Sequence, residues 1–275
     1  MSSRLPVSSP PSGGAVIVPD GPLPGATAVD SASGGALRTG AASIAVVVPT
    51  WQEANALPLL LESLRCQSCP PQLVLVADAG STDDSCHIAA QYGAVVVRCP
   101  QRGRGCQIAY ALRYCPAEVV VIAHADMVFP PRALERLQQW LQEHPHGVGG
   151  CFGHRFASDR WFYRLIEWAD RRRARRGMSY GDQAQFFRRA VLEQWGGFPA
   201  WPLFEDVALT QRLQQAGPLA YLDVPVLVST RRFQRLGLLR TLWRNWKLRR
   251  RWARHGPAVV DELYKEYYGP HLSSG

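Results

Sequence analysis

Polar and acidic residues follow three apolar segments of this 275-residue chain, at the points where those segments end. The residues concerned are Pro49-Thr50-Trp51-Gln52-Glu53, Asp78 and His124-Ala125-Asp126. Aspartate oxygens are ligands of Mg²⁺ or Mn²⁺, and such ions bridge the phosphates of nucleotides. Alternate residues of an extended segment point to the same side, so His124 and Asp126 would face one ligand together. These residue types indicate a nucleotide and metal site, unless the acids only terminate their strands.

The apolar segments before these residues have the pattern of strands that are buried on both faces. They are β-branched and continuous rather than alternating, and lie at Ile44–Val48, Leu73–Ala77, Ala94–Val97 and Val119–Ala123. Helical patterns lie between and after them, near residues 57–64, after 81–84, at 105–114 and at 134–141. The alternation predicts βαβ units, hence an α/β fold with a mostly parallel, Rossmann-like sheet flanked by helices. Ligands of such a sheet bind beyond the carboxyl ends of its strands, where the polar residues fall.

The second half of the chain has a less regular pattern. Helices are expected at 160–176 and 206–215, and strands at 184–187 and 220–228. A basic helix is expected over 236–255, with Leu and Trp side chains on one side. We therefore expect a single α/β domain over residues 43–230 and a basic, amphipathic C-terminal helical segment over 231–275.

The first 42 residues have a different composition from the rest. They hold 7 Gly, 6 Pro and 7 Ser and no aromatic residue, so they bury too little surface to offset their ordering entropy. We expect a disordered tail there. The seven cysteines are an odd number scattered over predicted strands and helices, which is typical of a reduced, cytoplasmic protein. No run approaches the roughly 18 apolar residues that a membrane span needs.

The net charge of +9 is concentrated near the C-terminus. Residues 231–254 carry ten Arg or Lys and no acid, a composition that suits phosphate groups, anionic lipid surfaces or nucleic acid. No helix-turn-helix, zinc-finger or RNA-recognition signature is present, so we predict no nucleic-acid partner. The basic helix is either a solvated structural helix or one that lies on an anionic membrane.

Two common nucleotide motifs are missing from the places where they would be needed. The turn after the first strand contains no glycine, which excludes the dinucleotide motif G-x-G-x-x-G there. The P-loop pattern G-x-x-x-x-G-K-[ST] is absent as well. With these two motifs excluded, the remaining interpretation is a nucleotide that carboxylates and a backbone turn hold, with a metal on its phosphates.

An ordered set of motifs resembles the family 2 glycosyltransferases, which have the GT-A fold. The motifs are VVVPTWQEANAL, LVADAGSTDDS, AHADM, GGFP and EDVALTQRLQQAG. The resemblance covers Ser43 to about Ala220 and depends on the set rather than on any single motif. Within the family, the chain is most similar to a bacterial subgroup that reads H-A-D, G-D-Q and R-R near these positions, where H-A-D is a variant of the D-x-D motif.

The resemblance implies which residues hold the nucleotide, through a base that is usually uracil-like. They are Pro49, Thr50, Glu53, Asp78, Arg104 and Gln107. The family often reads D-D-G-S, whereas this chain reads Asp78-Ala79-Gly80-Ser81, so only the first acid is kept. Asp78 has an alternative role as a turn former, and Arg104 and Gln107 have one as solvated helix residues.

Metal binding is implied for the H-A-D segment. Asp126 would bind the Mg²⁺ or Mn²⁺ that neutralises the leaving diphosphate. His124 departs from the usual Asp, and would either hydrogen-bond the ribose or join the metal and favour Mn²⁺. Strict dependence on a metal is therefore open, and a pair of polar residues that merely ends the strand is the alternative.

Catalysis with inversion needs a base for the acceptor hydroxyl, and the resemblance implies Asp206. The alternative for this acid is a helix N-terminal residue that the helix dipole favours. The remaining implied contacts, to the acceptor or the diphosphate, are Asp182, Gln183, Trp201, Glu205, Arg231 and Arg232. Asp182 as a plain turn residue and Trp201 as a core residue are the other interpretations.

The sequence thus predicts an inverting glycosyltransferase that uses a UDP- or GDP-linked sugar and a divalent metal. The acceptor is open, with a lipid-linked acceptor as one candidate, and the expected place is the cytoplasm or the inner face of the membrane. Two alternatives stay open: a non-catalytic GT-A scaffold that binds a nucleotide, and a nucleotidyltransferase on a related fold, which would release pyrophosphate.

Overall fold

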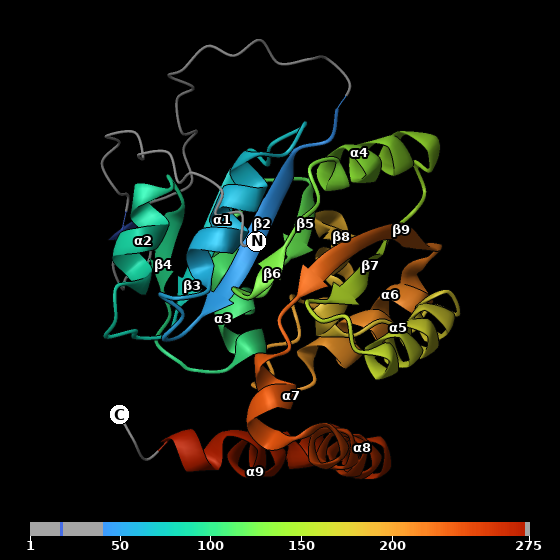
Figure 1. Ribbon diagram of the computed structural model, residues 1–275. Helices are drawn as coiled ribbons and strands as arrows, with labels where there is room; N and C mark the ends of the chain where they lie inside the picture. Colours follow the sequence, from blue (N-terminus) through green and yellow to red (C-terminus); the bar gives the residue numbers. More distant parts are fainter. Residues whose placement is uncertain (1–16, 19–40, 273–275) are drawn as a thin grey trace.

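A single mixed sheet forms the centre of the molecule (Figure 1). The computed structural model describes residues 17–18 and 41–272. In this part of the chain the strand order is β1-β4-β3-β2-β5-β8-β7-β9-β6. The strands are β1 (Ile17–Val18), β2 (Ile44–Thr50), β3 (Leu73–Asp78), β4 (Val95–Arg98), β5 (Val119–Ile122), β6 (Met127–Val128), β7 (Gly149–Phe156), β8 (Gln185–Arg188) and β9 (Leu219–Val228).

Helices cover the two faces of the sheet and one of its ends. The α-helices are α1 (Leu57–Arg65), α2 (Ser85–Gln91), α3 (Arg104–Ala111), α4 (Ala133–Glu143), α5 (Trp161–Ala174), α6 (Glu205–Ala216), α7 (Arg231–Leu236), α8 (Leu238–His255) and α9 (Val260–Leu272). Short 3₁₀ helices are η1 (Leu112–Tyr114), η2 (Gly181–Gln183), η3 (Arg189–Trp195) and η4 (Gly256–Val259). The predicted helices of the first half are all present within a few residues of their expected positions.

The strands of β4-β3-β2-β5 run parallel, as their continuous apolar pattern predicts. Their residues alternate between two cores: Val46 packs with α1, α2 and α4 on one face, and Val47 packs with α3 and α6 on the other. The register places Thr50 opposite Asp78, so the polar residues at the ends of β2 and β3 are neighbours.

The other half of the sheet departs from the parallel pattern. Strand β8 runs antiparallel to both β5 and β7, and β6 runs antiparallel to β9, while β7 and β9 are parallel. The sequence did not predict β7, because its glycines interrupt the apolar pattern. Gly150 has a structural reason: a Cβ there would lie 2.2 Å from the carbonyl oxygen of Ala220 on β9. The close approach of the two backbones requires glycine.

The C-terminal segment begins at Arg231 and folds back as three helices across one end of the sheet (Figure 1). The basic helix predicted over 236–255 is present as α8, and Gly237, whose φ of +78° favours glycine, separates it from the short α7, which was not predicted. Helix α9, which was not predicted, packs with α8 through buried Leu248 and Leu263 against Phe204, just before α6. These helices therefore border the start of α6, where Asp206 lies.

Most of the predicted disordered tail, residues 1–42, lies outside the described residues. Within it, Ile17–Val18 pairs with β4 as a two-residue edge strand. No helix among the described residues is both long enough and apolar enough to cross a membrane.

Candidate active site

Arg231 joins two of the acids that follow the strands. Its Nη2 lies 2.6 Å from Oε1 of Glu53, and its Nε lies 3.3 Å from Oδ2 of Asp126. Glu53 follows β2, Asp126 follows β5, and Arg231 begins α7 after β9. Residues about 180 positions apart in the chain are thus brought together at the carboxyl ends of the strands, as the parallel sheet predicts.

His124, Gly181 and Asp206 converge beside this ion-pair network. The N–H of Gly181 donates to Oδ2 of Asp206 at 2.7 Å, and the N–H of Val207 donates to its Oδ1 at 2.8 Å. A Cβ on Gly181 would lie 2.8 Å from Nε2 of His124 and 3.3 Å from Oδ2 of Asp206. Burial, together with the positive charge of Arg104, lowers the pKa of His124 to about 4, so its imidazole is neutral.

Glu205 and Arg104 form a largely buried ion pair next to Asp206, with 2.9 Å between Oε1 and Nε. Burial raises the pKa of Glu205 to about 7, although Arg104 opposes this shift. The pair connects α3 to the start of α6. Both residues were predicted to contact ligand, and in this structure they also hold the two helices together.

A cavity of about 130 Å³ opens beside Asp206. Its wall includes the charged residues Arg104, Asp182, Arg232 and Arg249 beside apolar residues such as Leu248. Helix α8 supplies one side of this wall and η2 another. The cavity is where the predicted acceptor residues Asp182 and Arg232 meet the predicted base.

Several predicted nucleotide residues are engaged by the fold itself. Pro49 and Thr50 are buried at the end of β2. The carboxylate of Asp78 accepts hydrogen bonds from the N–H groups of Gly80 and Ser81 at 3.0 Å, which are the contacts of a turn former. Gln107 is only 4% exposed, so it is not a solvated helix residue. Its Nε2 donates to the carbonyl oxygens of Thr50 and Ala77 at 2.8 and 2.7 Å, contacts that position the loops after β2 and β3.

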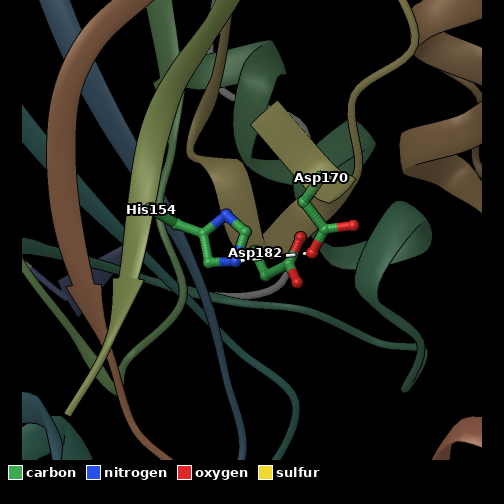
Figure 2. Close-up of side chains that lie close together, drawn as sticks. All are labelled: His154, Asp170 and Asp182. Atoms are coloured by element: carbon green, nitrogen blue, oxygen red, sulfur yellow. Dashed lines mark ion pairs between the residues drawn. The ribbon is translucent and has the colours of Figure 1, made fainter. Parts of the chain in front are cut away.

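Asp182 belongs to a second cluster, with His154 on β7 and Asp170 on α5 (Figure 2). One ligand atom from each residue lies within 4.8 Å of the others, a spacing that could hold a metal ion. Nε2 of His154 lies 3.5 Å from Oδ2 of Asp170, and Oδ1 of Asp182 is buried without a hydrogen bond. Arg173 also contacts Asp170, so a cation already neutralises one carboxylate of this cluster.

Opposing effects set the charge of this cluster. Burial works to raise the pKa of Asp182, but His154, Arg173 and Arg249 outweigh it and hold the pKa below its ordinary value. Burial and the neighbouring Asp182 raise the pKa of Asp170. Asp182 therefore stays ionised in the wall of the cavity.

The remaining predicted acceptor residues have structural partners. Gln183 is fully buried, and its Oε1 lies 3.3 Å from the N–H of Tyr180. Trp201 packs against the core of α6, α8 and α9, and its carbonyl oxygen accepts from the N–H of Gly105 at 3.1 Å. These contacts agree with the interpretation of Trp201 as a core residue.

Sequence reasoning missed the residues that β7 and α8 bring to the site. His154 lies in a glycine-rich strand that has no apolar run, so no periodic pattern singled it out. Arg249 was counted only as part of a basic helix. Trp51 also gained no role, although the guanidinium of Arg102 lies 3.2 Å from its ring centroid, beside the turn after β2.

Over residues 45–194, more than half of its length, the chain matches the family described as Glycosyl transferase family 2. It is 28% identical over 165 residues to the undecaprenyl-phosphate 4-deoxy-4-formamido-L-arabinose transferase of Serratia proteamaculans (strain 568), a match covering 54% of this chain and 50% of that protein. It is 26% identical over 258 residues to cellulose synthase 1 of Komagataeibacter xylinus, covering 85% of this chain and 16% of that protein. The chain therefore spans half or less of these curated relatives.

Solved structures share the fold at lower identity. The mannosyltransferase PcManGT from Pyrobaculum calidifontis, in complex with GDP-Man and Mn²⁺, has a TM-score of 0.56 and 22% identity over 84% of this chain and 70% of its own. TarS 1–349 from S. aureus, in complex with UDP-GlcNAc, has a TM-score of 0.56 and 20% identity over 68% of this chain and 58% of its own. The likeness establishes the mixed α/β fold of GT-A glycosyltransferases, as predicted. The family match covers most of the strands that carry the candidate site. The chain therefore belongs to glycosyltransferase family 2.

Proposed function

We propose that this chain is an inverting glycosyltransferase that moves a sugar from a UDP- or GDP-linked donor to an acceptor hydroxyl. The observation that carries the proposal is the grouping of acids from distant segments around Arg231 and His124. Arg231 joins Glu53 to Asp126, and Asp206 lies beside His124 at the adjoining cavity. Structures of the same fold contain GDP-Man and UDP-GlcNAc, which supports a nucleotide-sugar donor.

In the proposed step, Asp206 takes the proton of the acceptor hydroxyl. The hydroxyl oxygen bonds to the anomeric carbon from the side opposite the leaving group, which inverts that centre. The bond from this carbon to the diphosphate oxygen breaks, and its electron pair leaves with the nucleoside diphosphate. Two backbone N–H groups fix the Asp206 carboxylate, so its orientation is set before substrate binds. Arg231 and Arg232 are placed to offset the negative charge of the diphosphate.

We propose that Asp126 and His124 would hold a divalent cation. The residues fit this role: Asp126 offers a carboxylate, and Nε2 of the neutral His124 is buried without a hydrogen-bond partner. A bound cation would supply Lewis-acid stabilisation of the diphosphate. Arg231 lies where it would compete for Asp126. The cluster of His154, Asp170 and Asp182 is the second candidate, and Arg173 already pairs with one of its acids.

The proposal includes a lipid-linked acceptor and a position at the membrane. A relative is named as an undecaprenyl-phosphate transferase, which favours a lipid-linked acceptor here too. The basic helix α8 suits an anionic membrane, so we infer a peripheral position on the inner face of the membrane. No nucleic-acid partner is proposed.

Calorimetry with UDP and GDP, with and without Mn²⁺, tests the donor site. We expect one nucleotide to bind the wild type, and the Mn²⁺-dependent part of that binding to be lost in Asp126→Ala but kept in Asp159→Ala, a change at a fully exposed acid. Failure of both nucleotides to bind under any condition would remove the transferase proposal.

Turnover then separates an enzyme from a nucleotide-binding scaffold. With the donor that binds, Asp206→Asn should lower the release of nucleoside diphosphate by roughly 10²- to 10⁴-fold and leave nucleotide affinity unchanged. Inversion predicts the opposite anomer in the product, which NMR detects. Full activity of Asp206→Asn would contradict its role as base, and release of pyrophosphate would identify a nucleotidyltransferase.

A further inference from the structure

A groove leads away from the cavity beside Asp206. It has a volume of about 330 Å³, and apolar side chains from four elements line it: Phe156, Ile166, Phe233, Leu242 and Trp246. Asp182, Asn245 and Arg249 line both the groove and the cavity. The two spaces are therefore adjacent, and the groove adds an apolar wall to the charged and polar residues that the two share; Asp170 and Arg250 also line it.

Exposed apolar side chains also lie on the two helices α5 and α8 that line the groove. On α5, Trp161, Leu165 and Trp168 are 72%, 58% and 61% exposed, and their spacing places them on one helix face. On α8, Leu239 and Trp243 are 80% and 61% exposed and belong to the face that carries Leu242 and Trp246. Large apolar side chains that are exposed in such numbers on two helices are typical of a binding or membrane-contact site.

Two arginines in the charged part form no ion pair within the described residues, although the charge of Arg249 acts on Asp182. In the described part of the chain, Arg232 lies 4.1 Å from the ring centroid of Tyr267, and Arg249 lies 3.8 Å from that of Tyr180; neither forms an ion pair. Burial, with the charges of Arg104 and Arg244 nearby, lowers the pKa of Arg232 to about 10. Both guanidinium groups line the cavity, so an anion bound there would offset the positive charge around Arg232 and form charge-assisted hydrogen bonds.

We propose that this site binds the acceptor as an amphiphile, with a phosphate-bearing head at Arg232 and Arg249 and an apolar chain between α5 and α8. The inference rests on the proposed function, because the head would present its hydroxyl to Asp206. The two arginines without an ion pair in the cavity and the apolar groove that shares its lining select this occupant. The exposed tryptophans on both sides would meet the membrane in which such a chain lies.

Binding of three probes to the full chain, without nucleotide, tests this inference. They are dodecyl phosphate, used below its micelle concentration, dodecyl maltoside, which has the same chain and an uncharged head, and glycerol 3-phosphate, which has no chain. We expect dodecyl phosphate to bind at least about tenfold more tightly than either of the others, read by tryptophan fluorescence and calorimetry.

Variants assign the two halves of the site. Arg249→Gln should weaken dodecyl phosphate by about fivefold or more and leave the maltoside unchanged. Trp246→Ser should weaken both chain-bearing probes. Two exposed positions outside the groove serve as matched controls: Arg254→Gln at the end of α8 and Leu59→Ser on α1, for which we expect no change.

The inference fails if the maltoside binds as tightly as dodecyl phosphate, if glycerol 3-phosphate does so, or if Arg254→Gln weakens binding as much as Arg249→Gln. UDP and GDP binding by the same variants keeps the two proposals apart. Nucleotide binding without selective binding of dodecyl phosphate overturns only the acceptor site. Selective binding of dodecyl phosphate without any nucleotide binding supports the site and overturns the donor.

Discussion

Arg231 forms an ion pair with Asp126, the proposed metal ligand. Its Nε lies 3.3 Å from that carboxylate, and the side chain is 47% exposed, so solvent weakens the pair. A cation that binds Asp126 must share the carboxylate with this arginine or displace it. At the proposed metal site, Arg231 would therefore compete with the cation, and the H-A-D motif does not contain this side chain.

Removal of Arg231 should strengthen metal binding in the absence of nucleotide. For Arg231→Ala we expect roughly fivefold to tenfold tighter Mn²⁺ binding, because a partly screened positive charge is lost beside Asp126. Electron paramagnetic resonance of free Mn²⁺ measures it. Arg254→Ala, which removes a distant charge, is the control. Unchanged affinity in Arg231→Ala, or full affinity in Asp126→Ala, would place the metal elsewhere.

Gly181 allows His124 and Asp206 to approach each other. In Gly181→Ala the new methyl group would lie 2.8 Å from the His124 ring, so one of the two side chains must shift. We expect kcat to fall by roughly tenfold or more, since small displacements of a catalytic group are costly. Gly269→Ala on α9, where no atom lies within 4 Å, should leave kcat unchanged. Equal rates for both variants would show that the base tolerates displacement.

At the scale of elements, α3 fixes the ends of two neighbouring strands. The buried Gln107 amide links it to the last residue of β2 and to Ala77 of β3, and the Arg104–Glu205 pair links it to α6. Helix α3 thus positions the loops after β2 and β3 that would hold the nucleotide. Arg104 and Gln107 therefore have structural partners, and their contact with a nucleotide stays a prediction.

Loss of the hydrogen bonds of Gln107 should reduce the stability of the fold. Gln107→Leu leaves the buried carbonyl oxygens of Thr50 and Ala77 without this donor, and we expect a loss of roughly 2–4 kcal/mol in the free energy of unfolding. Urea titration measures the change. Gln142→Leu, at an exposed position of α4, should change stability by less than about 0.5 kcal/mol. A similar small effect at Gln107 would mean that water replaces the amide.

At the scale of the molecule, the C-terminal helices complete the site. Helices α8 and α9 pack on Leu203, Phe204 and Val207, around the start of α6, and α8 closes one side of the cavity. The parallel half of the sheet carries the predicted donor residues, and the mixed half with α5 and α8 carries the proposed acceptor side. Both halves meet at Asp206.

Weakening this packing should loosen the C-terminal helices. Leu263 is fully buried, and Leu263→Ala is expected to cost about 2–5 kcal/mol of stability. Limited proteolysis should then cut within residues 231–272 before the sheet domain is degraded. Leu239→Ala, at a side chain that is 80% exposed, should leave the cleavage pattern unchanged. Simultaneous loss of both parts would show that the helices and the sheet unfold as one unit.

The sequence alone determined the parallel half of the sheet and which residues end its strands. Continuous β-branched segments such as Val46–Val48 can be buried only between two helical layers, so local pattern is sufficient there. The predicted nucleotide and metal residues consequently lie at one edge of the sheet. The glycine-rich β7 and the helix α9 were missed, because long-range packing rather than local pattern stabilises them.

Only the tertiary structure decided which of these residues meet. The pairing of Arg231 with Asp126, the cluster of His154 with Asp182 and the groove between α5 and α8 join segments that are far apart in the chain. Residue type and spacing report on neighbours within a strand or a helix. Contacts across the mixed half of the sheet depend on strand order and on the packing of the C-terminal helices, which no local pattern encodes.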